Sequence, residues 1–418
     1  MNEDRSLSRT AWMVVALLFP VALLNYLDRQ MIAAMKVSVM GDIQDIGSDE
    51  NWGHMLASFK WVYAVFSPLG GYIADRFSRK LTICGSLFVW SLITWLTGHV
   101  SSFQELYWAR TAMGISEAFY IPAALALIAD YHTGGTRSRA VGVHQMGIYC
   151  GQMLGGFAGY SDRLEGGWRS LFDVTGLTGI LYAIPLLFLL RDAPSKPRPD
   201  VNGGPAAQTR AGTGIVELLT NRNFILLVAY FTLPAIAAWV VRDWMPAILQ
   251  KAFDISQGKA GVSATLYWQA AALLSAIFGG WLADRWIRKS IRGRIHVSAI
   301  GMMLIVPAMF GVGNAPALNS FALAIVALVL FGVGWGFFDC NNMPILSQIV
   351  RPELRATGYG IMNFVSMMCG GVADWGFGAM TDRGVPLNVI FGVFALVCVA
   401  SLFIVLLIRP RETPGGQG

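Results

Sequence analysis

Charged side chains are scarce in this chain. Aspartate, glutamate, lysine and arginine make up 13% of its 418 residues, whereas soluble domains carry about 25%. So few charges cannot cover the surface of a soluble protein of this length, which excludes a soluble globular fold. Hydrophobic residues make up 55% and the mean hydropathy is +0.53, and both values indicate an integral membrane protein.

Cysteine pairs and catalytic motifs are lacking as well. The five cysteines are an odd number and lie in or beside apolar runs, so they predict no disulfide framework. The chain contains no HExxH, no GxSxG, no phosphate-binding loop and no histidine–cysteine cluster with metal-ligand spacing. We therefore expect no enzymatic activity, no metal, no cofactor and no direct use of ATP. The opening MNEDRSLSRT lacks a basic segment with a small-residue cleavage site, so no cleaved signal peptide is expected.

Apolar runs are what the chain has in abundance. Each extends over about 20 residues, enough to cross a hydrocarbon layer of about 30 Å as a helix. Because lipid cannot satisfy exposed backbone groups, these runs predict an all-α integral membrane protein with twelve transmembrane helices. The predicted spans are residues 11–34, 53–74, 81–100, 105–130, 140–160, 169–190, 222–249, 260–283, 294–313, 318–346, 357–379 and 387–408.

Lysine and arginine predict the orientation in the membrane. With the N-terminus placed inside, the inner loops and tails carry 21 of the 31 basic residues, the outer loops carry six, and four lie within spans. This excess predicts cytoplasmic N- and C-termini in a multi-pass protein of the cell (plasma or inner) membrane. It also accounts for the net charge of +6 without a nucleic-acid partner.

One long polar segment interrupts the spans. Residues 191–220 are rich in proline, glycine and basic residues, as flexible linkers are. We predict a cytoplasmic linker there, between an N-terminal six-helix bundle at residues 1–190 and a C-terminal six-helix bundle at residues 221–418. Six spans on either side suggest an internal duplication.

Two loops carry the same signature. GGYIADRFSRK at 70–80 and GGWLADRWIRK at 279–289 share Gly-Gly, Ala-Asp-Arg and Arg-Lys, and each follows the second span of its half. Gly71 and Gly280 are expected to allow close helix contact. The carboxylate of each loop is expected to hold a helix N-terminus or a neighbouring arginine, as a latch that breaks and reforms. The predicted latch residues are Asp75, Arg76, Arg79, Asp284 and Arg285.

The paired loops, the twelve spans and the central linker resemble the major facilitator superfamily. NYLDR at 25–29, SFKWVYAVFSPLGGYIADR at 58–76 and RTAMGISEAFYIPA at 110–123 resemble its anion:cation symporter family. The resemblance implies the major facilitator fold, with two pseudo-symmetric six-helix bundles around a central cavity that opens alternately to the two membrane faces. It also implies transport of an organic anion such as a sugar acid, in many members together with protons.

Several charged side chains lie within predicted spans, where an unpaired charge costs about 2.5–3.5 kcal/mol. Together they would cost on the order of 20 kcal/mol, more than the net stability of most proteins. They must therefore pair or face water, either as static ion pairs between helices or as a common polar site. These side chains are Asp28, Arg29, Lys60, Arg110, Glu117, Arg242, Asp243 and Asp339.

The arginines are the first candidates for binding an anion, because a guanidinium group is a planar fork of donors that matches a carboxylate. Arg110 and Glu117 lie two turns apart on one helix face, and we expect Arg29 and Arg110 to bind the substrate. Lys60 would add a third positive charge. The resembled family often has a neutral residue at that position, so Lys60 points to a more anionic substrate or to changed coupling.

Carboxyl groups are the candidates for carrying protons. Burial and a neighbouring arginine change the proton affinity of a carboxyl group in opposite directions, so substrate arrival can shift the balance. Asp28 and Glu117 are the predicted carriers, a role that the resemblance also implies. Asp339 precedes Pro344 by five residues, as Glu117 precedes Pro122, and is expected to be its counterpart in the second half.

Uncharged polar residues complete the predicted binding site. Gln145, Tyr149 and Gln152 form one helical stripe suited to hydroxyl groups. Their stretch resembles a glycine-rich antiporter motif, but Gln152 stands where that motif has proline, which argues against obligate exchange. Arg242 and Asp243, at the outer end of the seventh span, are expected to form a gating salt bridge or to contact substrate. The polar candidates for substrate binding are Tyr26, Tyr63, Tyr149, Gln152, Asn341 and Asn363, and for the tyrosines helix packing is the alternative.

These residues predict a secondary active transporter that carries a small organic anion, such as an aldonate or uronate, together with protons. Sodium fits less well, and a monomer in the lipid bilayer is expected. The alternatives are an organic-anion exchanger and a neutral-sugar or drug carrier of the same superfamily, and the buried cations argue against a neutral or cationic substrate. A membrane sensor would need an output domain, for which the linker and the termini are too short.

Overall fold

The structure, a computed structural model, describes residues 2–132, 136–193 and 214–410, and every regular element within these ranges is helical. Contacts divide the chain into two compact units. Unit 1 comprises Met1–Pro194, Val240–Leu266 and Gly370–Gly384, and unit 2 comprises Ser195–Trp239, Tyr267–Cys369 and Val385–Gly418. Most of the predicted linker at 191–220 falls outside the described residues, so the boundaries at 190 and 221 stay predictions.

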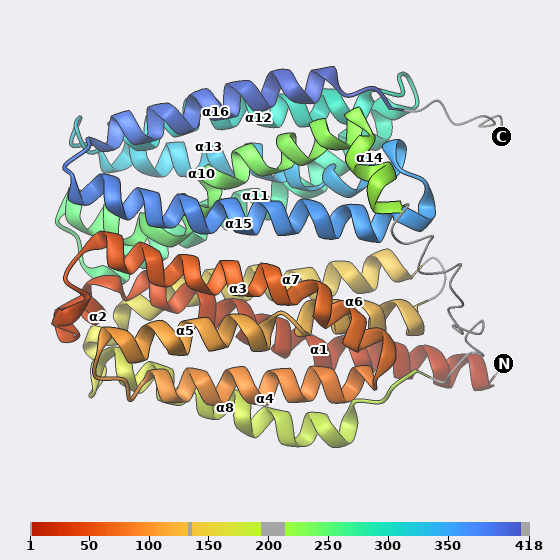
Figure 1. Ribbon diagram of the computed structural model, residues 1–418, viewed down its shortest axis with the longest axis horizontal. Coiled ribbons are helices and arrows are strands. Elements are labelled where there is room, and N and C mark those ends of the chain that lie inside the picture. Colours follow the sequence, from red (N-terminus) through yellow and green to blue (C-terminus); the bar gives the residue numbers. More distant parts are fainter. Residues whose placement is uncertain (1, 133–135, 194–213, 411–418) are drawn as a thin grey trace. The chain divides into compact units, whose positions relative to one another are not determined.

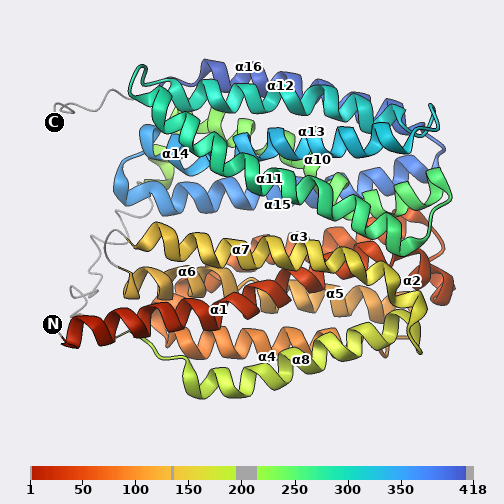
Figure 2. The same cartoon turned by 180° about the vertical axis from the view of Figure 1, so that it is seen from behind.

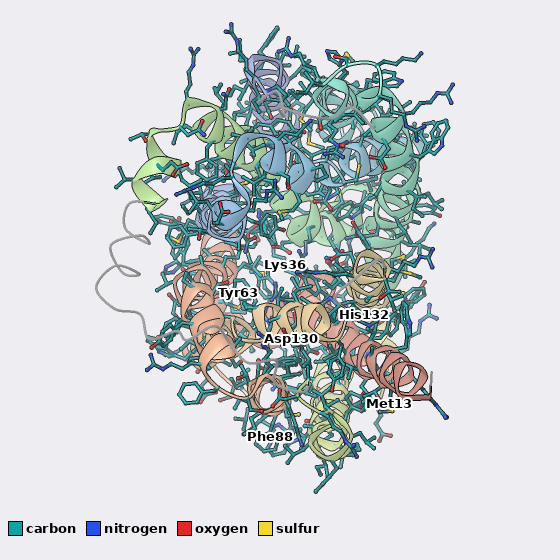
Figure 3. The ribbon with its side chains drawn as sticks, turned by 90° about the vertical axis from the view of Figure 1, so that its right-hand side faces the viewer. Met13, Lys36, Tyr63, Phe88, Asp130 and His132 are labelled. Atoms are coloured by element: carbon teal, nitrogen blue, oxygen red, sulfur yellow. The ribbon has the colours of Figure 1, made fainter. Side chains whose placement is uncertain are left out.

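Unit 1 is built mainly on the helices of the first half of the chain. These are α1 (Asn2–Ala34), α2 (Lys36–Asp42), α3 (Asp49–Arg76), α4 (Arg79–Thr97), α5 (Phe103–Glu117), α6 (Tyr120–Tyr131), α7 (Arg137–Gly156) and α8 (Gly167–Leu189), with 3-10 turns η1 (Gln44–Ile46) and η2 (Phe157–Arg163). The long helices run side by side (Figures 1 and 2), with α1 against α7, α4 against α8 and α3 against α5. In an end-on view, exposed Met13 and Phe88 lie at the periphery, and buried Tyr63 lies farther inside (Figure 3).

Unit 2 is built mainly on helices of the second half. The helices are α10 (Arg222–Phe253), α11 (Gln257–Ile287), α12 (Gly293–Asn314), α13 (Phe321–Asp339), α14 (Asn342–Ile349), α15 (Arg355–Asp382) and α16 (Leu387–Leu407), with the 3-10 turn η3 (Pro352–Leu354). Within the unit, α12 packs against both α13 and α16. Helices α10, α11 and α15 each contribute one end to unit 1, which places three second-half segments among the first-half helices.

The helices match the predicted spans. Nine segments in the described residues are long and apolar enough to cross a membrane by length and composition alone. Helices α3, α7 and α15 correspond to the three other predicted spans, and they are of similar length but richer in glycine and polar residues. The prediction of an all-α membrane fold is confirmed.

Two predicted spans are broken helices, each interrupted at the same position relative to a proline. The span at 105–130 divides into α5 and α6 at Ala118 and Phe119, and the span at 318–346 divides into α13 and α14 at Cys340 and Asn341. The prolines are Pro122 and Pro344, four residues after Ala118 and Cys340. A proline ring lacks the amide hydrogen and collides with the carbonyl four residues earlier, so each helix breaks there. Glu117 and Asp339 are consequently the last residues of α5 and α13.

The glycine pairs of the repeated loops pack through their first member. A Cβ atom on Gly70 would lie 2.5 Å from the carbonyl oxygen of Ala118, and one on Gly279 would lie 2.8 Å from the ring of Phe337. The prediction for Gly71 and Gly280 is wrong, because a Cβ on either would meet nothing within 4 Å. Neighbouring residues point about 100° apart around a helix. The Gly-Gly motif alone does not indicate which of its two glycines faces the neighbouring helix.

Replacing Gly70 with alanine should destabilise the protein by about 1–3 kcal/mol, because the new Cβ overpacks the contact with the carbonyl of Ala118. The measurement is the midpoint of thermal unfolding of purified protein in detergent. Gly71→Ala is the matched control, since its Cβ has open space and alanine favours a helix over glycine by roughly 0.5–1 kcal/mol. Its midpoint should be unchanged or higher, and equal midpoints for the two variants would contradict this packing.

Candidate functional site

Arg29, in the last turns of α1, is held by an acid and three aromatic rings. Its side chain is 4% exposed, and its Nε donates to Oε2 of Glu117 at 2.6 Å. The guanidinium carbon lies 4.7, 5.0 and 4.8 Å from the ring centroids of Tyr26, Phe59 and Tyr63. Cation–π contacts of this kind contribute roughly 0.5–2 kcal/mol each when desolvated. The rings fix the guanidinium group, whereas its Nη2 has no hydrogen-bond partner.

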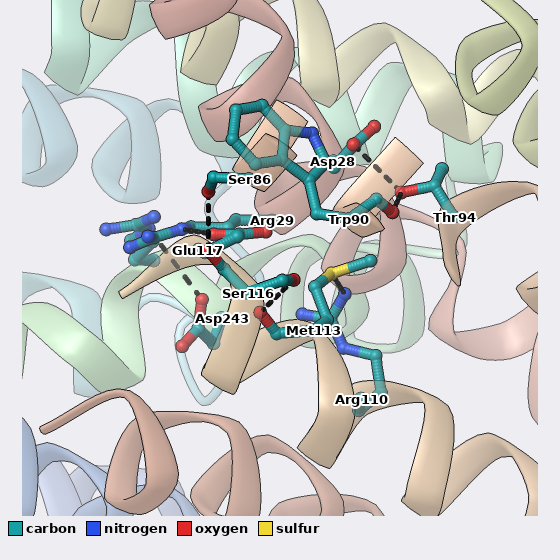
Figure 4. A network of polar contacts seen from close by, with 11 residues as sticks. Asp28, Arg29, Ser86, Trp90, Thr94, Arg110, Met113, Ser116, Glu117 and Asp243 are labelled. Atoms are coloured by element: carbon teal, nitrogen blue, oxygen red, sulfur yellow. Dashed lines mark hydrogen bonds and ion pairs between the residues drawn. The ribbon is translucent and has the colours of Figure 1, made fainter. Parts of the chain in front are cut away.

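Arg110 lies beside this pair and is only 2% exposed. Its guanidinium carbon is 5.1 Å from the centroid of Phe59, the ring that Arg29 also contacts. Nη1 lies 3.0 Å from the sulfur of Met113, a weak acceptor, and Nε has no partner (Figure 4). Among the residues that the structure describes, Arg110 forms no ion pair with a carboxylate. It is a buried cation with unused donors.

Asp28 is buried at 2% exposure but points away from Arg29, because successive residues of a helix diverge by about 100°. The hydroxyl of Thr94 on α4 lies 3.0 Å from its Oδ2 and also 3.0 Å from the carbonyl of Trp90 (Figure 4). Oδ1 of Asp28 has no hydrogen-bond partner. A carboxylate supported by a single hydroxyl is costly to bury in its ionised form.

Lys60 of α3 is the centre of a buried ion network. Its Nζ pairs with Asp243 of α10 and with Asp374 of α15, and the three side chains are 3%, 9% and 0% exposed. Asp243 also lies 3.9 Å from Nε of Arg242. The predicted pair of Arg242 and Asp243 is therefore part of a larger group that includes Lys60.

Arg242 connects the Lys60 network to the residues around Arg29. Its guanidinium carbon lies 5.4 Å from the ring centroid of Tyr26, a ring that also contacts Arg29. The backbone carbonyl of Arg242 accepts a hydrogen bond from Nε2 of Gln30 at 3.0 Å. We name the whole set the buried charge cluster. Its members are Asp28, Arg29, Lys60, Arg110, Glu117, Arg242, Asp243 and Asp374, each at most 9% exposed.

Further contacts tie the same segments together at the start of α3. The carboxylate of Asp382, at the end of α15, accepts from the backbone N–H groups of Asp49 at 3.1 Å and Glu50 at 2.7 Å. An acid at a helix N-terminus is favourable because the first N–H groups carry partial positive charge. Lys36 of α2 lies 2.5 Å from Oδ1 of Asp49 and 4.3 Å from the ring centroid of Trp244. Burial lowers the pKa of the Lys36 ammonium, which lies outside the spans, and the Asp49 carboxylate opposes that shift.

Gln257 makes a second tie in unit 1, at the start of α11. Its Oε1 accepts from the backbone N–H and the hydroxyl of Ser38, both at 3.0 Å, and its Nε2 donates to the carbonyl of Gly159 at 3.2 Å. The ends of α10, α11 and α15 are thus bonded to α1, α2, α3 and η2. These contacts gather at one end of unit 1.

The predicted latch residues of the first loop contact their own half. Nη1 of Arg79 donates to the carbonyl of Ala126 at 2.8 Å, and Arg79 pairs with Asp130, so it joins the start of α4 to α6. Arg76 contacts the hydroxyl of Tyr72 at 2.5 Å. These contacts lie within unit 1.

In the second loop, Asp284 of α11 pairs with Arg294 of α12 at 3.5 Å, as expected for a carboxylate facing a neighbouring helix. Arg285 lies 6.0 Å from the ring centroid of Trp281. The side chain of Asp75, the matching acid of the first loop, is not among those that the structure describes. The latch function of both loops stays a prediction.

The remaining predicted residues are distributed between the units. Tyr149 and Gln152 lie on α7 in unit 1 and are 8% and 7% exposed. Asp339, Asn341 and Asn363 belong to unit 2, where Nδ2 of Asn341 donates to the carbonyl of Phe337 at 2.9 Å. Of the predicted residues, the structure brings together Tyr26, Asp28, Arg29, Lys60, Tyr63, Arg110, Glu117, Arg242 and Asp243.

Three polar residues of this region are not among the predicted ones. Asp374 completes the Lys60 network, and it could have been found because it is an acid within the predicted span at 357–379. Thr94 and Gln30 had no such signal. Their role depends on which neighbours they face, and hydropathy does not report this.

Known proteins resemble the chain along most of its length. A family model described as the Major Facilitator Superfamily matches residues 18–373. Protein spinster homolog 1 of Xenopus tropicalis is 26% identical over 381 residues, which cover 85% of this chain and 70% of that protein. The sphingosine-1-phosphate transporter SPNS2 of Mus musculus is 26% identical over 368 residues, which cover 83% of this chain and 65% of that protein.

A solved structure shares the fold. It is described as a bacterial homolog to the human lysosomal transporter Spinster in an inward-facing and unoccupied conformation. The TM-score is 0.75 at 20% sequence identity, over 96% of this chain and 95% of the other. At that identity the likeness concerns the fold alone.

Lys60→Met should destabilise the protein by about 3–5 kcal/mol, because it leaves the buried carboxylates of Asp243 and Asp374 without their cation. The midpoint of thermal unfolding in detergent measures the loss. Adding Asp374→Asn to this variant removes one uncompensated charge and should recover part of it. A Lys60→Met protein that unfolds at the wild-type temperature would show that the network does not stabilise the fold.

Proposed function

Because the chain belongs to the Major Facilitator Superfamily, and its named relatives are transporters rather than enzymes, we propose that it carries a small organic anion across a membrane together with protons. The expected substrates are sugar acids such as an aldonate or a uronate, and related carboxylates. Alternating access is the proposed mechanism. The residues that carry the proposal are those of the buried charge cluster.

Arg110 is the observation that supports an anionic substrate. It is buried, it makes no ion pair in the described part of the chain, and its Nε has no partner. Burying a cation without an ion-pair partner costs free energy. A substrate carboxylate that binds beside Arg110 would offset that cost. Arg29 shares the Phe59 ring with Arg110, and its Nη2 is also unused. The two guanidinium groups together offer planar donor pairs for one carboxylate.

Charge balance supports the coupling to protons. When all members are ionised, the buried charge cluster has four positive and four negative side chains, and its net charge is zero. One additional anion would leave a buried negative charge, whereas an anion that enters with one proton leaves the cluster neutral. Asp28 and Glu117 are the proposed proton carriers. Asp28 has only a hydroxyl partner, and Glu117 holds the arginine that the substrate would contact.

Substrate and proton are linked at the Arg29–Glu117 pair. A substrate carboxylate that takes the donors of Arg29 competes with Glu117 for them, and a protonated Glu117 yields them more readily. If protonation of Glu117 favours anion binding by some factor, anion binding favours its protonation by the same factor. This reciprocity couples the two solutes without direct contact between them.

Separation of the contacts at one end of unit 1 is the proposed conformational step. With the termini in the cytoplasm of the cell, that end of unit 1 would face outward. The Lys60 network and the Asp382 cap on α3 join helices of the two halves of the chain there, so they must separate for substrate to pass. Two acids around one lysine favour closure, and a change in the charge of the cluster would weaken it.

An amphipathic phosphate ester is the second candidate substrate. A relative of this chain is named as a sphingosine-1-phosphate transporter, and three aromatic rings surround Arg29 in this protein. Arginine binds a phosphate group with the same planar donors that it offers to a carboxylate. The same cluster therefore suits both head groups, and only the room for an apolar tail would distinguish them.

Uptake should require an inward proton gradient. Proteoliposomes that contain the purified protein should accumulate a labelled aldonate or uronate, or else sphingosine-1-phosphate, when the outside is acidic. A protonophore should abolish accumulation but not equilibration. Accumulation that is unchanged by the protonophore would contradict proton coupling and favour exchange.

Glu117→Gln should separate coupling from transport. The amide cannot lose a proton, so gradient-driven accumulation should fall by at least tenfold, as expected when a group with a role in proton transfer is removed. Counterflow exchange of labelled for unlabelled substrate should remain. Glu165→Gln, which changes an exposed acid, is the control and should leave both activities intact. If Glu117→Gln abolishes counterflow as well, Glu117 binds substrate or supports the fold instead.

A further inference from the structure

A cavity in unit 2 is lined by the ends of three transmembrane helices. Its volume is about 330 Å³. Arg222 begins α10, Arg292 immediately precedes α12, and Arg409 follows α16. The other lining residues are Asn223, Leu406 and Leu407.

The charge around this cavity is of one sign. Three of the six lining residues are arginines and none is acidic. Glu217, the acid on the segment before α10, is engaged by Arg351 at 2.8 Å. In the described ranges, the side chains of Arg222 and Arg409 form no ion pair. Three guanidinium groups around one cavity repel one another, and a bound anion would offset that repulsion.

Hydrogen bonds hold the walls of the cavity in place. Nη2 of Arg292 donates to the carbonyl of Leu406 at 2.6 Å and to that of Ile408 at 3.4 Å, which satisfies carbonyl groups at the end of α16. The backbone N–H of Arg409 donates to Oδ1 of Asn223 at 3.0 Å. A site that is already ordered loses less conformational entropy when a ligand binds.

The position of the cavity relative to the membrane, and the residues around it, indicate which anion it fits. Because it lies where three spans end, it lies at the level of lipid head groups rather than of acyl chains. Leu406, Leu407 and Phe403 of α16 are 39%, 55% and 62% exposed, and they form an apolar surface beside the arginines. Basic pockets between transmembrane helices bind the phosphate groups of anionic lipids, and arginine matches a phosphate with two parallel donors.

We propose that the cavity lined by Arg222, Arg292 and Arg409 binds the phosphate head group of an anionic phospholipid, with the acyl chains along the exposed face of α16. The lipid fastens the ends of α10, α12 and α16 to one another. This site is independent of the proposed transport mechanism. On the proposed orientation it takes lipid from the cytoplasmic leaflet.

The test compares phosphatidylglycerol with phosphatidylcholine. Native mass spectrometry of the full chain in mixed micelles should show phosphatidylglycerol retained in preference to phosphatidylcholine. The Arg222→Gln/Arg409→Gln double variant leaves the structural hydrogen bonds of Arg292 intact, and it should weaken phosphatidylglycerol binding roughly tenfold to thirtyfold. Arg288→Gln/Lys289→Gln removes the same charge from exposed positions outside the cavity, and it should bind phosphatidylglycerol as the wild type does.

Three results would overturn the proposal. One is undiminished phosphatidylglycerol retention by the Arg222→Gln/Arg409→Gln variant. Another is an equal loss in both double variants, which would reveal general attraction to a basic surface. The third is displacement of phosphatidylglycerol by millimolar glycerol 3-phosphate or inorganic phosphate, which would assign the cavity to a soluble anion. Thermal unfolding in phosphatidylcholine micelles, equal for all three proteins, verifies that each is folded.

Discussion

Compensation of buried charge is the constraint on which the rest of this structure depends. The buried charge cluster of unit 1 contains four cations and four acids, each at no more than 9% exposure. Any of them left alone would cost several kcal/mol in so apolar a setting. The arrangement nevertheless leaves Arg110 without a carboxylate and Asp28 with only a hydroxyl. In the proposed mechanism, these two incomplete partnerships, rather than the complete ones, are where a solute and a proton enter.

The two broken helices place an acid, Glu117 or Asp339, at the end of a helix within the span. A proline four residues after the break ends α5 just beyond Glu117 and α13 just beyond Asp339. The first of these acids reaches Arg29 of α1, and the second lies at the matching position of the other unit. The same backbone feature thus recurs together with an acid in both halves, as the predicted internal duplication would require. The sequences around the two acids differ, and the paired arginines Arg29 and Arg110 lie in the first half.

The fold and most residues of the site could be predicted from the sequence, because each depends on local signals. Span positions follow from apolar runs, and Arg29, Arg110 and Glu117 stand out as charges within them. The ion-pair partners of these charges could not be predicted from local signals. Nothing in the sequence placed Lys60 against both Asp243 and Asp374, because that contact joins residues more than 180 positions apart. The prediction of a close contact at Gly71 rather than Gly70 fails for a similar reason, since helix rotation decides which of two neighbours meets the other helix.

Proton uptake on anion binding tests the central claim most directly. Isothermal titration calorimetry of the purified protein with its anion, in two buffers that differ in ionisation enthalpy, counts the protons that accompany binding. The account predicts uptake of about one proton per bound anion, so that the heat depends on the buffer while the affinity does not. Binding with the same heat in both buffers would mean that the anion enters without a proton. The charge balance of the cluster would then have to be maintained in another way.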